Sequence, residues 1–130
     1  MDYRDRNDRI THDDIIEIAY QQLDKVKHDV YKNPGSKKNA GIGDNYPDII
    51  ITDKGSTTVR FIIEVETAES LNDDEVKQWQ KYAAEINASF FILVPLSSKA
   101  NVLQLIKTKN INARIGTYSV VGKDLVIKYE

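Results

Sequence analysis

Apolar residues recur along the chain with two different periods, and these periods predict its helices and strands. Where the apolar positions lie three and four residues apart, an amphipathic helix is expected. The first such run follows Thr11, which has the spacing of a capping box with Asp14. The second follows Asn72, which can cap a helix while Glu75 occupies the third helical position, and the third is expected to be capped by Ser97 or Ser98. The side chains expected to face the core are Ile15, Ile16, Ala19, Tyr20, Leu23 and Val26 in the first helix, Val76, Trp79, Ala83 and Ile86 in the second, and Val102, Leu103 and Ile106 in the third.

Runs of β-branched and aromatic residues, separated by turn residues, predict strands. "PDIIIT" and "VRFIIEVE" are joined by "DKGST", so we expect an antiparallel pair, and their continuous apolarity indicates that both faces of the sheet are covered. Gly122 and Lys123 read as the two-residue turn of a further hairpin. The expected strands are 47–52, 59–66, 89–95, 113–121 and 124–130, and "HDVYK" at 28–32 is either a helical turn or a short strand.

The resulting order of elements predicts an α/β fold. With 28–32 as a strand, the order is α, β, β, β, α, β, α, β, β, which is typical of a mixed sheet between layers of helices. A chain of 130 residues suits one domain, which we place at 11–130. Residues 1–10 alternate acids and arginines without an apolar face, so we expect a flexible N-terminal arm.

Composition and charge narrow the classes of function. There is no cysteine, so a metal would be held by oxygen or imidazole, and the presence of only two histidines argues against zinc. The formal net charge of −2 argues against a broad basic surface, so any contact with nucleic acid must be local. No apolar run approaches the roughly 18 residues that a membrane helix needs, and "MDYRDRNDRI" at 1–10 contains no hydrophobic segment of the kind that forms a signal peptide. We therefore expect a cytoplasmic protein without a membrane partner.

Three acidic residues stand at the ends of two apolar strands. Asp48 opens one strand, and Glu64 and Glu66 close the next. Side chains two residues apart in a strand point the same way, so Glu64 and Glu66 share one face, and an antiparallel hairpin places Asp48 beside them. Two like charges about 4 Å apart repel by roughly 4 kcal/mol at an effective dielectric near 20, so either a proton or a cation must compensate. A hard divalent ion such as Mg²⁺ accepts such oxygen ligands.

These residues resemble the signature of the PD-(D/E)xK nuclease superfamily, in which Pro-Asp opens one strand and acid-x-Lys ends the next. The match is Pro47-Asp48 followed by Glu64-Val65-Glu66. The resemblance implies a restriction-endonuclease-like three-layer core, with a central mixed β-sheet flanked by helices. It covers roughly residues 12 to 94.

Further matches lie outside the strands. Many members of the superfamily carry a glutamate in the first helix that completes the metal site, and here the candidate is Glu17. The branch with a RecB-type nuclease domain has Gln-x-x-x-Tyr in the helix after the core strands, and "QWQKY" matches it with Gln78 and Tyr82. Residues four apart share a helix face, so both can reach one site. "VYKNPGS" is similar to the short strand and loop of archaeal Holliday-junction resolvases.

The chain departs from the superfamily at one position. Glu66 stands where the motif has lysine, which removes the cation thought to orient or activate the attacking water. A few restriction endonucleases of the superfamily have an acid there, so Glu66 could be a general base or an additional ligand. Lys81, beside Gln78 and Tyr82, could supply the missing lysine.

The resemblance implies a divalent-metal-dependent DNA endonuclease, and a catalytically degenerate module for nucleic-acid binding or protein assembly is the alternative. Asp48 and Glu64, with Glu17 through water, would hold Mg²⁺ or Mn²⁺, which would activate water and neutralise charge on the phosphate. Lys37 and Lys38 would contact flanking phosphates. Small members often dimerise, and the C-terminal hairpin offers an edge for a homodimer.

Each of these residues also has an ordinary structural interpretation. Glu17 fits the solvated edge of a helix, Tyr82 fits core packing, and the loop lysines fit solvated charges. His12 and His28 read as surface residues at helix ends, and Trp79 as core.

Overall fold

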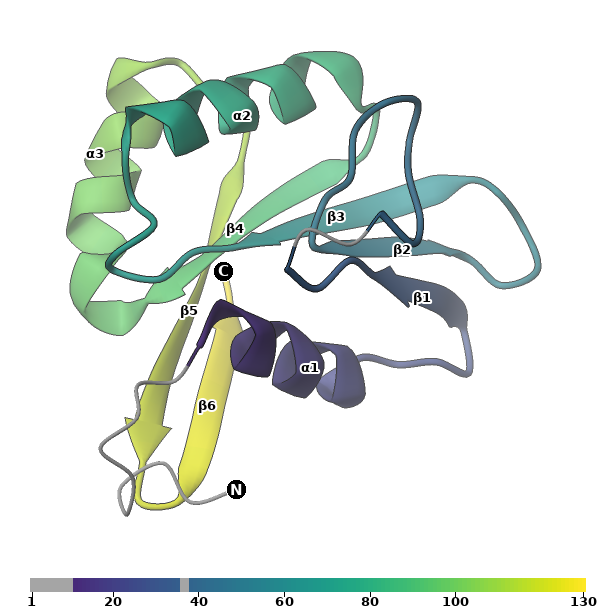
Figure 1. The fold of residues 1–130 in the computed structure, drawn as a ribbon, viewed down its shortest axis with the longest axis horizontal. Coiled ribbons are helices and arrows are strands. Elements are labelled where there is room, and N and C mark those ends of the chain that lie inside the picture. The colour runs from purple at the N-terminus through teal and green to yellow at the C-terminus, as the bar shows by residue number, and fades with distance from the viewer. Residues whose placement is uncertain (1–10, 36–37) are drawn as a thin grey trace.

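The protein is built around a six-stranded mixed sheet that carries helices on both faces (Figure 1). The structure is a computed structural model that describes residues 11–35 and 38–130. The N-terminal arm expected at 1–10 therefore lies outside the described residues, as does Lys37. The helices are α1 (His12–Gln22), α2 (Asp73–Glu85) and α3 (Lys99–Thr108), with a short 3₁₀ turn, η1 (Leu96–Ser98), before α3; the strands are β1 (His28–Lys32), β2 (Ile49–Asp53), β3 (Val59–Val65), β4 (Ser89–Pro95), β5 (Arg114–Val121) and β6 (Asp124–Tyr129).

The strands lie side by side in chain order, from β1 to β6. The pairs β3–β4 and β4–β5 are parallel. The pairs β1–β2, β2–β3 and β5–β6 are antiparallel. The predicted mixed sheet is confirmed, and 28–32 is a strand rather than a helical turn. Gly122, at a φ of 64°, makes the tight turn between β5 and β6, because glycine adopts this left-handed conformation without steric cost.

Local capping explains where the first two helices begin. The Thr11 side chain accepts a hydrogen bond from the Asp14 N–H and the Asp14 carboxylate accepts one from the Thr11 N–H, so the predicted capping box is confirmed. The Asn72 side chain caps α2 by accepting from the Glu75 N–H at 3.0 Å. The serine cap predicted for α3 is wrong: Ser98 occupies the N-cap position but makes no side-chain capping bond, because the 3₁₀ turn η1 leads directly into the helix.

Two predicted inward-facing residues are exposed. Val26 is 85% exposed, because α1 ends at Gln22 and the Asp24 side chain then accepts hydrogen bonds from the N–H groups of Val26 and Lys27 in a turn. Leu103 is 45% exposed, because the helical period that buries Val102 turns the next residue about 100° away from the core. Both inward assignments were wrong.

The core is divided between the two faces of the sheet. α1 covers one face, and α2 and α3 cover the other (Figure 1). Because strand residues alternate in direction, Ile63 and Val65 of β3 pack on the α1 side, whereas Ile62 packs on the α2 side. Glu64 lies two residues after Ile62 in β3, so its side chain also points to the α2 side of the sheet. No helix among the described residues is long and apolar enough to cross a membrane.

Candidate functional site

The open end of the β2–β3 hairpin joins Asp48 to Glu64. The Asp48 N–H donates to Glu64 Oε1 at 2.8 Å, and the Val65 N–H donates to Asp48 Oδ2 at 2.7 Å. Both carboxylates are buried. Antiparallel pairing sets Ile49 opposite Ile63, and this register brings the start of β2 beside the end of β3. The sequence prediction that these two acids converge is thus met in the structure.

Glu66 lies one residue beyond β3 and is the most deeply buried of the predicted acids, at 1% exposure. Its carboxylate accepts hydrogen bonds from the Trp79 indole N–H at 2.9 Å and from the Ser70 hydroxyl at 2.6 Å. The Tyr118 hydroxyl also donates to the Glu66 backbone carbonyl at 2.7 Å. These bonds hold the side chain in a defined orientation toward α2.

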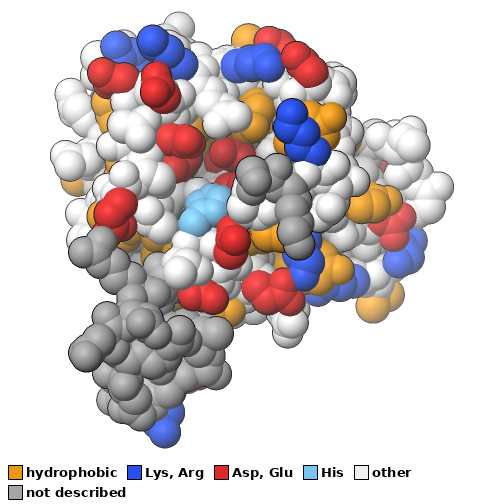
Figure 2. All heavy atoms as spheres, in the orientation of Figure 1, with side chains coloured by type: hydrophobic (Ala, Val, Ile, Leu, Met, Phe, Trp, Pro, Cys, Tyr) orange, Lys and Arg blue, Asp and Glu red, His pale blue; other side chains and the backbone are white. Residues whose placement is uncertain are grey.

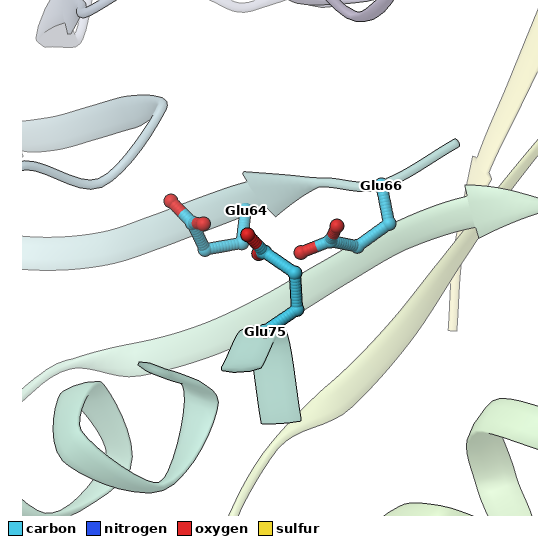
Figure 3. Close-up of side chains that lie close together, drawn as sticks. All are labelled: Glu64, Glu66 and Glu75. Carbon is cyan, nitrogen blue, oxygen red and sulfur yellow. The ribbon is translucent and has the colours of Figure 1, made fainter. Parts of the chain in front are cut away.

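Glu75 supplies a third carboxylate, from the first turn of α2. Glu64, Glu66 and Glu75 each offer an oxygen, and these atoms lie within 4.8 Å of one another. Figure 3 shows the Glu66 and Glu75 carboxylates facing each other, with Glu64 of β3 beside them. We call these three residues the acidic cluster. Sequence reasoning missed Glu75, to which it gave only a place in the helix cap; the available signal was that the buried stripe of α2 begins at the next residue, Val76.

The acidic cluster is electrostatically uncompensated. Burial, together with the nearby charge of Asp48, raises the pKa of Glu64 well above its usual value. Burial and a hydrogen bond with Glu75 raise the pKa of Glu66 to about 8. Among the described residues, no lysine or arginine forms an ion pair with Glu64, Glu66 or Glu75. Without a cation, the pKa of about 8 leaves Glu66 protonated at neutral pH.

His12 is a basic group that contacts Asp48, the acid hydrogen-bonded to Glu64. Its Nε2 lies 3.0 Å from Asp48 Oδ2, and this hydrogen bond raises the pKa of His12 to about 9. The neighbouring Asp13 carboxylate accepts the Gly35 N–H at 2.7 Å, which ties the loop after β1 to α1. Sequence analysis gave His12 no role, since a surface position at a helix end was expected. Near the centre of Figure 2, between α1 and α2, acidic side chains (red) surround a histidine side chain (pale blue) at the surface.

Gln78 and Tyr82 lie together on α2, as the motif predicts. Gln78 Nε2 donates to the Tyr82 hydroxyl at 2.8 Å. Tyr82 is buried, and its pKa is raised by burial and by the nearby charges of Glu64 and Asp48. Its hydroxyl end thus lies close to the acids.

A pocket of about 330 Å³ adjoins Tyr82 and is also lined by Gln78, Lys81 and Lys38. Lys81 lies 3.6 Å from Asp44, to which it is ion-paired, and the Lys38 ammonium lies 5.1 Å from the centre of the Tyr46 ring. The structure therefore brings four of the predicted residues to one pocket.

Glu17 is placed differently from the predicted metal ligands. It forms an ion pair with Lys32 and accepts a hydrogen bond from Gln21 at 3.0 Å. The hydrogen bond from Lys32 lowers the pKa of Glu17, and its side chain is 46% exposed. Glu17 is not part of the acidic cluster. This position was not evident from the sequence, because it depends on how β1 packs against α1.

Comparisons of the chain with models of protein families, with curated proteins and with solved structures found no match. The assignment of a function therefore depends on the chemistry of the acidic cluster and its neighbours.

Proposed function

We propose that this protein is a divalent-metal-dependent DNA endonuclease that hydrolyses phosphodiester bonds. The observation that carries the proposal is the acidic cluster, three carboxylates from β3 and α2 whose oxygens lie within 4.8 Å of one another. Asp48 lies beside this cluster, because its backbone N–H donates a hydrogen bond to Glu64. Buried carboxylates without a cationic partner are costly, and such groups occur preferentially at functional sites.

The donor set fits a hard cation. The ligand atoms of the acidic cluster are all carboxylate oxygens, which Mg²⁺ and Mn²⁺ accept, and the cluster contains neither thiolate nor imidazole. When bound, either ion would lower the pKa of a coordinated water and neutralise charge on the phosphate. Asp48, Glu64 and Glu75 would hold it, so that Glu75 takes the place that the resemblance gave to Glu17.

Glu66 is suited to act as the general base in place of the missing lysine. Its pKa of about 8 places it near the operating range of a base that takes a proton from water. Trp79 and Ser70 fix its orientation by donating to its two oxygens. Lys38 and Lys81 line the adjoining pocket, where they would attract the phosphates on either side of the scissile bond.

The fold supports the same assignment. The mixed sheet is covered by α1 on one face and by α2 and α3 on the other, which is compatible with the three layers of a restriction-endonuclease-like core. We propose that the hairpin of β2 and β3 corresponds to the motif strands of the PD-(D/E)xK superfamily, because Asp48 and Glu64 meet at its open end.

A non-catalytic module is the second candidate, and the environment of Glu66 favours it. Both oxygens of Glu66 already accept hydrogen bonds from protein groups, and its raised pKa keeps it protonated below about pH 8. In that case Glu66 and Glu75 would share a proton, and the site would be a buried polar network of a nuclease fold that binds nucleic acid or another protein without cleaving it.

Metal titration separates the two candidates. We expect isothermal titration of the wild type with Mn²⁺ at about pH 8 to show saturable binding that Glu64→Gln weakens strongly. Supercoiled, branched and single-stranded DNA would then be incubated with each protein and Mg²⁺ or Mn²⁺. Metal-dependent nicking by the wild type alone supports the endonuclease, whereas equal nicking by both proteins would point to a contaminant. Absence of Mn²⁺ binding would favour the non-catalytic module.

A further inference from the structure

The pocket beside Tyr82 has one wall formed by the segment that precedes Pro47. Asn33, Asn45 and Tyr46 line it together with Gln78 and Tyr82 of α2. Asn33 is anchored against the site, because its side-chain amide donates to the Pro47 carbonyl at 2.7 Å and its N–H donates to the Asp48 carbonyl at 2.9 Å. The pocket thus adjoins the strand that carries Asp48. Its volume of about 330 Å³ is at the lower end of the range for small-molecule sites, about 300 to 1,000 Å³.

Asn45, which lines this pocket, has an unused hydrogen-bond acceptor. The residue is 4% exposed, and its Oδ1 has no hydrogen-bond partner among the residues that the structure describes. Its Nδ2 donates to Glu85 Oε1 at 3.2 Å, so the amide cannot be flipped without placing two oxygens together. A buried acceptor without a partner costs free energy. A ligand whose N–H reached Asn45 Oδ1 would recover this free energy.

Tyr46 supplies an aromatic ring next to Asn45. A methyl group at Gly41 would lie 2.7 Å from Cε1 of this ring, so the ring packs against the Gly41 backbone, and only glycine leaves room for it there. The Lys38 ammonium is 5.1 Å from the ring centre. An aromatic ring, a cation and an amide side chain therefore line one pocket, and these are the groups that recognise a base with its phosphate.

We propose that this pocket holds the base of one unpaired nucleotide of the substrate, with Asn45 Oδ1 accepting an N–H from the Watson–Crick edge of the base. Tyr46 stacks on the base, and Lys38 and Lys81 contact the adjoining phosphate. The inference rests on the proposed function and narrows its substrate. In a duplex the N–H groups of this edge are engaged by the opposite strand, so the base must be single-stranded, bulged or flipped out of the helix to enter.

Nucleotide titration without divalent metal tests the pocket directly. In EDTA, the ¹⁵N-labelled wild type is titrated with each of the four deoxynucleoside monophosphates and with deoxyribose 5-phosphate. We expect the Asn45 side-chain amide and the Tyr46 N–H to shift saturably with the nucleotides, and the sugar phosphate to bind about tenfold more weakly. No shift at these groups, or equal binding of the sugar phosphate, would overturn the proposal.

Oligonucleotides then test whether the nucleotide belongs to DNA. Anisotropy in EDTA compares a duplex carrying one bulged nucleotide, the same duplex with an abasic bulge, and a fully paired duplex. The base-containing bulge should bind about tenfold more tightly than the other two. Equal binding of all three would overturn the assignment to a DNA substrate.

Variants assign the effect to the pocket. Asn45→Ala should remove the preference for a base over an abasic site, and Asn101→Ala, an exposed residue of α3, should keep it. Lys81→Ala should weaken all of the DNAs, whereas Lys77→Ala on the same helix should not. Retention of base preference by folded Asn45→Ala would overturn the role of Asn45, and the wild-type titration decides the proposal if that variant does not fold.

The failure of this proposal can be told apart from the failure of the proposed function. Glu64→Gln should keep base-dependent binding in EDTA while losing cleavage. Base-dependent binding without metal-dependent cleavage would overturn the endonuclease and leave the pocket standing. If DNA is cleaved equally well with and without an unpaired base, the proposed role of the pocket is overturned and the endonuclease function is not.

Discussion

The two ends of the β2–β3 hairpin hold acidic side chains in opposite ways. At the turn end, Asp53 is exposed and Arg60 donates to both of its oxygens, with Nε lying 2.9 Å from Oδ1. At the open end, Glu64 and Glu66 are buried beside Glu75, and no lysine or arginine pairs with these three in the part of the chain that the structure describes. One hairpin thus carries solvated, paired acids at one end and desolvated, unpaired acids at the other.

Burial and the lack of a cationic partner are what distinguish a candidate functional site from an ordinary ion pair on the surface. An exposed ion pair gains little stability, because water screens both charges. A buried carboxylate without a cation costs free energy unless a proton or a metal neutralises it. The acids at the open end of the hairpin therefore need a proton or a cation to neutralise them, whereas Asp53 at the turn end is already paired with Arg60.

Glu64→Gln should have the largest effect. Loss of partners outside the metal's own ligands commonly costs 10- to 100-fold, so loss of a direct ligand should lower metal-dependent cleavage by at least about a hundredfold. The amide oxygen can still accept the Asp48 N–H, and the neutral side chain suits burial, so the thermal midpoint of the metal-free protein should rise. Cleavage assays and thermal melts measure both. Asp53→Asn, at the turn end, should leave cleavage unchanged; a Glu64→Gln enzyme as active as wild type would contradict the comparison.

Metal binding should become stronger as pH rises. The ion competes with protons on the acidic cluster, and the pKa of Glu66 is about 8. The increase in thermal midpoint produced by Mn²⁺ or Mg²⁺ should therefore be larger at about pH 8.5 than at about pH 6.5. Glu66→Gln, which has no proton to lose, should reduce this dependence. An increase that is the same at both pH values would mean that the cluster does not bind the ion.

The metal-free protein should lose stability as pH rises from about 4.5 to about 8. The pKa of Glu66 is raised from 4.5 to about 8 by burial, so the folded state binds this proton more tightly than the unfolded state does. Its contribution is fully present below pH 4.5 and is lost as pH rises through about 8. Urea unfolding in EDTA should show a decline on the order of a few kcal/mol, and Glu66→Gln should flatten it. Parallel curves for the two proteins would contradict the raised pKa.

His12→Gln should cost about 1 to 2 kcal/mol of unfolding free energy near pH 6, because it removes the charge beside Asp48. The pKa of His12 is raised from 6.5 to about 9, so this contribution is fully present below pH 6.5 and disappears as pH rises through about 9. Urea unfolding at about pH 6 and pH 10 measures the difference. An equal loss at both pH values would indicate lost packing rather than lost charge.

Arg60→Ala should have the smallest effect. The Asp53–Arg60 pair is exposed at the turn end, so its removal should move the thermal midpoint by no more than about 2 °C and should leave metal binding unchanged. Differential scanning calorimetry with and without Mn²⁺ is the measurement. A loss of metal binding would show that the two ends of the hairpin are coupled.

Features set by neighbours in the sequence were predictable. The capping box of Thr11 and Asp14, the Asn72 cap and the strands of both hairpins follow from local patterns, and the structure has them. The meeting of Asp48 with Glu64 was also predictable, because one antiparallel hairpin with a short turn determines which residues face each other. The errors at Val26 and Leu103 arose at helix ends and edges, where local hydrogen bonding and the exact helical phase decide exposure.

The sequence by itself determined the elements, the mixed α/β order and the three acids at the end of the hairpin, Asp48, Glu64 and Glu66. Only the tertiary structure decided which further side chains reach those acids. Glu75 arrives because α2 packs across β3, His12 because α1 begins beside β2, and Glu17 is diverted to Lys32 because β1 lies next to α1. The unpaired Oδ1 of Asn45 likewise depends on the packing of its loop against α2. Such contacts join different layers of the fold, and no spacing along the chain encodes the position and rotation of one layer on another.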